Sequence, residues 1–129
     1  MIYTSYFAAM RKMTNEQKKN CISISRFTPK GIIIPNYTLL APSAMILSNY
    51  KMYKDELEYT IHFTNHLNRL DIEKIYRDLD GKILLCYESP EKFCHRHLVA
   101  KWFNDHGFEC KELEFPKPKP MFVQQSYFD

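Results

Sequence analysis

The sequence predicts a small α/β domain of three-layer type, with a mostly parallel sheet of about four strands flanked by helices. Strand-like and helix-like segments alternate along 129 residues, a length that suits one domain. The segment 82–88, KILLCYE, is an apolar run between turn signals, which is typical of a central strand buried on both faces. A helix-like segment and a last strand-like segment, 109–115, follow it. If the two strands are parallel, this order predicts a right-handed βαβ unit.

The N-terminal third contains two of the expected strands. Residues 2–6, IYTSY, are rich in β-branched and aromatic side chains and predict the first strand. Residues 7–20 are polar and free of glycine, and we expect a short helix followed by a loop. Residues 21–25, CISIS, alternate and predict the second strand. Residues 32–43 are apolar but interrupted by two prolines, which favours an ordered loop.

Helical segments occupy the middle of the chain. Ser43 is expected to cap a helix that runs to about Tyr53, and a second helix is predicted over residues 54–70. Asp71 is expected to cap a third helix over residues 72–79. The apolar face expected for the second helix consists of Leu57, Ile61, Thr64, Leu67 and Leu70. A fourth helix is predicted over residues 94–107, with Leu98, Val99, Trp102 and Phe103 inward and Gly107 at its end.

Composition excludes several classes of protein. The chain has 18 basic and 15 acidic residues, and no run of basic residues suggests the clustered face of a dedicated nucleic-acid binder. A basic pocket for one small anion remains compatible with this charge. Only three glycines are present, so no glycine-rich phosphate loop is expected. No segment approaches the roughly 18 apolar residues of a membrane span, and we expect no membrane partner.

The two ends of the chain carry further expectations. The start, MIYTSYFAAMRK, does not resemble a signal peptide, so we expect a cytoplasmic protein with its four cysteines reduced. We expect one domain over residues 1–115 and a tail over residues 116–129. The tail alternates proline and lysine and then becomes apolar and aromatic. It is either a frayed end or an arm that docks on its own domain or on another copy, as in a homo-oligomer.

The segment 84–98, LLCYESPEKFCHRHL, is the strongest candidate for a functional site. Glu88 follows a predicted strand, and Cys94, His95 and Arg96 begin the next predicted helix. In open α/β sheets, ligands collect where strand ends meet helix N-termini, and such helix ends attract anions. Arg96 adds a guanidinium that suits phosphate or carboxylate. The sequence therefore predicts an anion-binding corner.

A catalytic thiol is the second interpretation of this segment. A cysteine at a helix start beside histidine and arginine favours the thiolate, which makes Cys94 a candidate nucleophile. His95 or His97 would move protons near neutral pH, and Glu88 is a further polar candidate. The alternative is that Cys94 is a small buried hydrophobic residue.

Metal binding is disfavoured by the sequence, and we expect neither a metal nor another cofactor. Cys86, Cys94, His95 and His97 match the ligand types of zinc but lack the paired spacing of zinc motifs. Adjacent helical residues point about 100° apart, so Cys94 and His95 are not expected to share a metal. The spacing from Cys86 to Arg96 is also too long for a phosphatase loop.

These motifs resemble the signature of domain-of-unknown-function family 488, over roughly residues 2–115. The family has a Cys-x-Glu strand end, here Cys86 and Glu88, and a Cys-His-Arg helix start, here Cys94 to Arg96. Further similar segments are YTSYF, with Thr4, Ser5 and Tyr6, SISRFTP, with Arg26 and Pro29, and LAPS at 40–43, which is typical of a short form in phages and mobile elements. Many members have Asp where this chain has Ile24. The resemblance implies a compact α/β domain in which Ser5, Arg26 and Glu88 approach Cys94 and Arg96, and it implies no established reaction.

Three functions follow as expectations. The first is a pocket for a small anionic ligand, a nucleotide or nucleic-acid fragment. The residues expected to bind it are Ser5, Tyr6, Arg26, Cys86, Tyr87 and Arg96, and Phe27 is a further ring on which a base would stack. The second is an enzyme that acts on a nucleotide-like substrate through Cys94, His95 and Glu88. The third is a non-catalytic sequestering or inhibitory module of phage type, located in the host cytoplasm, that oligomerises through the tail.

Overall fold

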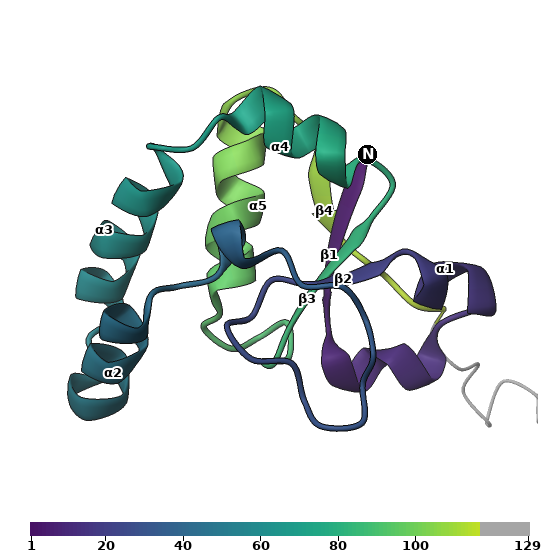
Figure 1. Ribbon diagram of the computed structural model, residues 1–129, viewed down its shortest axis with the longest axis horizontal. Coiled ribbons are helices and arrows are strands. Elements are labelled where there is room, and N and C mark those ends of the chain that lie inside the picture. Colours follow the sequence, from purple (N-terminus) through teal and green to yellow (C-terminus); the bar gives the residue numbers. More distant parts are fainter. Residues whose placement is uncertain (117–129) are drawn as a thin grey trace, which may run out of the picture.

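A computed structural model describes residues 1–116 and shows a four-stranded, all-parallel sheet with helices on both faces (Figure 1). The strands are β1 (Ile2–Tyr6), β2 (Cys21–Ser23), β3 (Ile83–Cys86) and β4 (Cys110–Glu112), in the order β2-β3-β1-β4. The predicted α/β class and the parallel pairing are confirmed. The strands expected over 21–25, 82–88 and 109–115 are shorter in the structure, because their outer residues do not pair with a neighbouring strand.

The helices are η1 (Phe7–Lys12), α1 (Asn15–Lys19), η2 (Thr38–Leu40), α2 (Ala44–Tyr53), α3 (Glu56–Leu67), α4 (Ile72–Leu79) and α5 (His95–Asp105), where η denotes a 3-10 helix. The predicted caps Ser43 and Asp71 each accept a hydrogen bond from the first turn of α2 and α4. Gly107 follows α5 with a φ of 84°, as expected for the residue that ends it.

Two helix boundaries differ from the prediction. Residues 7–20 contain two helices, because Thr14 and Gln17 form a reciprocal capping box that starts α1. Lys54 is left-handed, with a φ of 54°, and Asp55 caps α3, so that the second helix begins at residue 56. In both caps, a polar side chain accepts a hydrogen bond from the backbone N–H of the residue three positions later.

Strand alternation divides the core into two clusters. Ile22, Leu84 and Ile2 face α3, α4 and α5, whereas Ile83 and Leu85 pack with η1 and with Met13, which follows it. Helix α5 packs on the sheet, α3 packs on α5, and α2 packs on α3 (Figure 1). The α2–α3 pair therefore lies on the side of α5 that faces away from the sheet (Figure 1).

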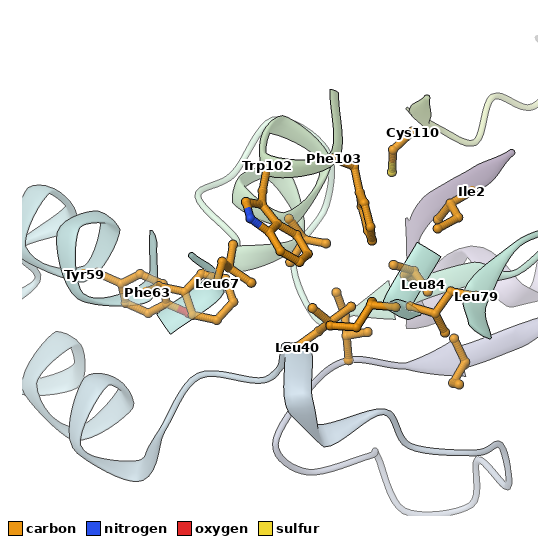
Figure 2. Packing of buried hydrophobic residues seen from close by; sticks show 14 residues of the cluster. Ile2, Leu40, Tyr59, Phe63, Leu67, Leu79, Leu84, Trp102, Phe103 and Cys110 are labelled. Atoms are coloured by element: carbon orange, nitrogen blue, oxygen red, sulfur yellow. The ribbon is translucent and has the colours of Figure 1, made fainter. Parts of the chain in front are cut away.

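The face that α3 buries differs from the predicted one. Tyr59, Phe63 and Leu67 are buried and extend into the larger cluster (Figure 2). Leu57 is 71% exposed and Ile61 is 50% exposed. Of the predicted face, Leu67 is buried in the core and Leu70 packs against it, whereas the rings of Tyr59 and Phe63 take the buried positions nearer the start of α3.

Among residues 1–116, no helix is long and apolar enough to cross a membrane. Residues 117–129 of the predicted tail, which was expected over 116–129, and the homo-oligomer expected through it lie outside the described residues.

Candidate functional site

A cavity of about 210 Å³ opens beyond the carboxyl ends of β2 and β3, beside the start of α5. Its wall contains six of the nine residues predicted from the sequence: Arg26, Cys86, Tyr87, Glu88, Cys94 and His95. Its other lining residues are Ser25, Phe27, Pro42, Leu47, Tyr50, Tyr59 and Phe93. The prediction of a pocket where strand ends meet a helix start is therefore matched by a cavity at that place.

Strand alternation decides which residues reach the cavity. Cys86 lies at the end of β3 on the same face as Leu84, toward α5. Ser5 pairs with Leu85, whose side chain belongs to the opposite cluster, and Ser5 is fully buried. The structure therefore does not bring Ser5 to the cavity, because one step along a strand reverses the face.

Arg96 lies behind the cavity wall and does not line it. Its side chain is fully buried, and Nε and Nη2 donate to the two carboxylate oxygens of Glu112 at 3.1 and 2.9 Å. Nη1 lies 3.0 Å from Cys86 Sγ and also donates to the carbonyl oxygen of Glu88. Tyr6 is beside it, with its ring 5.7 Å from the guanidinium. The contacts of Arg96 hold the end of β3 in place, and neither Arg96 nor Tyr6 is brought to the cavity.

Arg26 is the arginine that the structure places at the cavity. It directly follows Ser25 beyond the end of β2, and its side chain is exposed. Phe27, which is 70% exposed, lies beside the Arg26 guanidinium at 5.9 Å. A cation and an aromatic face thus meet at the rim of one cavity.

Aromatic residues that the sequence analysis did not single out form one wall of the cavity. The rings of Tyr50 and Phe93 are stacked with centroids 5.4 Å apart, and Tyr59 meets Phe93 edge-on at 5.0 Å. Tyr50 comes from α2 and Tyr59 from α3, and the two reach the cavity because α3 packs on α5 and α2 packs on α3. Phe93 directly precedes Cys94, and this position is what could have predicted from the sequence that Phe93 lines the cavity.

His95 is almost completely buried on the cavity wall. Its Nε2 lies 2.7 Å from the carbonyl oxygen of Ile24, and its Nδ1 lies 3.9 Å from Cys94 Sγ. Burial lowers the pKa of His95 to about 4, so the imidazole is neutral at pH 7. Nε2 then donates a hydrogen bond to the carbonyl oxygen of Ile24, and the lone pair of Nδ1 faces Cys94.

Cys94 precedes α5 in an extended conformation, with φ −155° and ψ 144°. Because Cys94 is not helical, its Sγ lies close to Nδ1 of His95. The prediction that these neighbours point about 100° apart, as two helical residues do, was therefore wrong. In the structure Cys94 is joined to Cys86 in a disulfide. This pairing differs from the expectation that all four cysteines are reduced, although its Cα separation of 7.4 Å is wider than disulfides usually have, and Cys21 and Cys110 are free thiols.

One polar group in the cavity wall has no partner within the described residues. Ser25 is 4% exposed, and its Oγ makes no hydrogen bond to residues 1–116. A buried hydroxyl without a partner is costly, and a ligand in the cavity would satisfy it.

Comparison with known families yields a match to a family model. A family model described as "DUF488-N3a: Active DUF488-N3 subclade" matches residues 6–107, which is well over half of the chain. The match spans the cavity and every predicted site residue except Ser5. No curated protein and no solved structure matches the chain.

Proposed function

From the premise that this chain belongs to the DUF488 family, in its N3a subclade, we propose that the cavity binds a small anionic ligand, a nucleotide or a nucleic-acid fragment. The observation that carries this proposal is the combination, in one cavity, of stacked aromatic rings and the Arg26 cation at the rim. Ser25 Oγ, which is buried without a partner, supplies a polar group for the ligand.

The aromatic wall suits a flat, uncharged part of the ligand. Tyr50 and Phe93 present rings on one side, and Phe27 presents a ring at the rim. Stacking of a base on an aromatic side chain contributes about 1–3 kcal/mol. A nucleobase in contact with these rings would place its attached phosphate near Arg26, where a guanidinium forms charge-assisted hydrogen bonds.

The role of Arg96 in this proposal differs from the one expected from sequence. Its donors already serve Glu112, Cys86 and the backbone of Glu88. Arg96 therefore orients the cavity wall, and Arg26 carries the contact with the anion.

Isothermal titration of the protein with adenosine monophosphate, with adenosine and with ribose 5-phosphate tests the proposal. We expect the nucleotide to bind at least tenfold more tightly than either fragment, because base and phosphate contact different walls. Arg26→Ala should weaken nucleotide binding by about tenfold or more, since a charged hydrogen bond contributes about 1.5–3 kcal/mol.

Lys30→Ala is the matched control, because Lys30 is an exposed cation on the same loop that does not line the cavity. Its affinity should equal that of the parent chain. Equal affinity of ribose 5-phosphate and the nucleotide would show that the rings do not contact a base. Equal losses in the Arg26 and Lys30 variants would show that the charge effect is not local.

A thiol-dependent enzyme is the second candidate, and the contact between Cys94 Sγ and His95 Nδ1 inside the cavity favours it. The word "Active" in the family description accords with it. Since His95 has a pKa of about 4, it is a weak base at neutral pH.

Alkylation of the reduced protein by iodoacetamide tests the nucleophile. We expect Cys94 to react faster than free cysteine at pH 7, and bound nucleotide to slow the reaction. A Cys94 that reacts tenfold more slowly than free cysteine would remove it from a catalytic role while leaving the binding proposal intact.

A further inference from the structure

Two sulfur atoms and an imidazole nitrogen converge at the floor of the cavity. The ligand atoms of Cys86, Cys94 and His95 lie within 4.8 Å of one another, and all three residues are buried. We propose that in the reduced protein these three residues bind a divalent, thiophilic metal ion such as Zn²⁺. This inference stands apart from the proposed nucleotide site, because it requires no nucleotide.

The backbone brings the three ligands together from two elements. Cys86 ends β3, and Cys94 is the extended residue that precedes α5. Because that residue is extended, two neighbours in sequence aim their side chains at one point. This arrangement replaces the paired spacing that short zinc motifs use to achieve the same convergence.

His95 already has the tautomer that a metal ligand needs. Its Nε2 is 2.7 Å from the carbonyl oxygen of Ile24, which fixes the proton on Nε2. Nδ1 is left with its lone pair toward the sulfurs. Metal-ligating histidines usually donate their second ring N–H to a carbonyl or carboxylate in this way, which orients the ring.

The distance between Cys94 Sγ and His95 Nδ1 is near that of two ligands on one tetrahedral ion. With zinc bonds of about 2.3 Å to sulfur and about 2.0–2.1 Å to nitrogen, a shared ion sets the two atoms about 3.6 Å apart. Cys94 Sγ and His95 Nδ1 are 3.9 Å apart. The Cα atoms of Cys86 and Cys94 are 7.4 Å apart, beyond the roughly 4.4–6.8 Å usual for disulfides. Two thiolates bound to one ion accommodate a wider backbone separation.

The surroundings favour thiolates and leave one position open. Arg96 Nη1 is 3.0 Å from Cys86 Sγ and stabilises negative charge there, while the Arg96 charge itself is balanced by Glu112. With three protein ligands, the fourth position faces the cavity, which all three residues line. A water molecule or a donor atom of a bound ligand would complete the coordination, as in zinc sites with an open position.

Metal binding requires that the Cys86–Cys94 disulfide first be reduced. A thiol or phosphine reductant supplies two electrons, the S–S bond breaks, and two protons are taken up to form two thiols. The metal ion then replaces these two protons as it binds two thiolates. The oxidised chain, in contrast, offers only His95 and should not bind the ion.

The test uses Co²⁺ as a spectroscopic probe in place of Zn²⁺. The full-length protein is reduced with a phosphine, freed of metal and titrated with Co²⁺ without oxygen. We expect one ion per chain, a thiolate-to-cobalt charge-transfer band in the near ultraviolet and visible bands of a tetrahedral ion, all lost when Zn²⁺ is added. Cys94→Ser and His95→Ala should each weaken Co²⁺ binding by at least tenfold.

Cys21→Ala is the control, because Cys21 is a buried free thiol that faces the opposite cluster. It should retain the spectrum. Since His95→Ala removes a buried ring and can perturb folding, the oxidised and reduced forms of the unaltered chain are also compared. Equal Co²⁺ affinity in these two forms, or no charge-transfer band in the reduced form, would overturn the proposal. Nucleotide binding measured with and without Zn²⁺ separates this outcome from failure of the proposed function.

Discussion

The guanidinium of Arg96 donates two hydrogen bonds to the carboxylate of Glu112, 3.1 and 2.9 Å long. Arg96 is fully buried at the start of α5, and Glu112 ends β4 sixteen residues later. Thr4 Oγ1 donates to the same carboxylate at 2.7 Å, from the strand position opposite Glu112. The pair therefore joins α5 to two strands and supports the cavity wall from behind.

Removing Arg96 should destabilise the protein strongly. Arg96→Ala removes a fully buried side chain and leaves the Glu112 carboxylate, which is 27% exposed, without its cation, so the loss should be about 3 kcal/mol, at the lower end of the cost of breaking a buried pair. Urea denaturation measures the free energy of unfolding. Lys111→Ala removes an exposed ion pair with Glu109, 3.0 Å long, and should leave the free energy of unfolding nearly unchanged. Similar losses in the two variants would contradict a structural role for Arg96.

The buried face of α3 makes a second prediction. Phe63 is fully buried between helices, and Phe63→Ala should lower the free energy of unfolding by about 3–5 kcal/mol. Leu57 is 71% exposed on the same helix, so Leu57→Ala should change it by no more than about 0.5 kcal/mol. Thermal or urea unfolding ranks the two variants. A larger loss of stability in Leu57→Ala than in Phe63→Ala would instead support the buried face that the sequence predicts.

The carboxyl group of Asp78 should titrate at unusually low pH. Its hydrogen bond with Lys74, then that with Tyr37, lowers the pKa of Asp78 below its ordinary value. Because the folded pKa is depressed, this group stabilises the fold above the unfolded pKa and loses that contribution as pH falls through the folded pKa. Carbon-13 NMR of the side-chain carboxyl measures the midpoint. Lys74→Ala should move it upward, and an unmoved midpoint would show that Lys74 is not the cause.

Cys21 and Cys110 should resist alkylation in the folded chain. Burial raises the pKa of Cys21 to about 11 and that of Cys110 to about 12, so few thiolates exist at pH 8. Mass spectrometry after treatment of the reduced protein with iodoacetamide should find both unmodified, while Cys94, which lines the cavity, is modified first. Addition of urea should expose all four cysteines. Early modification of Cys110 in the folded chain would contradict its burial.

Local pattern in the sequence determined the α/β class, all four strands and the caps Ser43 and Asp71, because these depend on alternation and on hydrogen bonds between near neighbours. The segment 84–98 also located one wall of the cavity. Strand boundaries were less accurate, since a strand ends where its partner does, and the partner is distant in the chain.

Only the tertiary structure decided which arginine reaches the cavity. Arg26 and Arg96 have the same side chain, and both lie in segments that the sequence predicts to form the ligand-binding site. Parallel pairing of β1 with β4 brings Glu112, which is 27% exposed, against the fully buried Arg96, whereas Arg26 is exposed at the rim of the cavity. Likewise, Tyr50 and Tyr59 become cavity walls because α2 and α3 pack outward from α5. Burial is a property of the assembled chain, and it separates residues that the local sequence cannot distinguish.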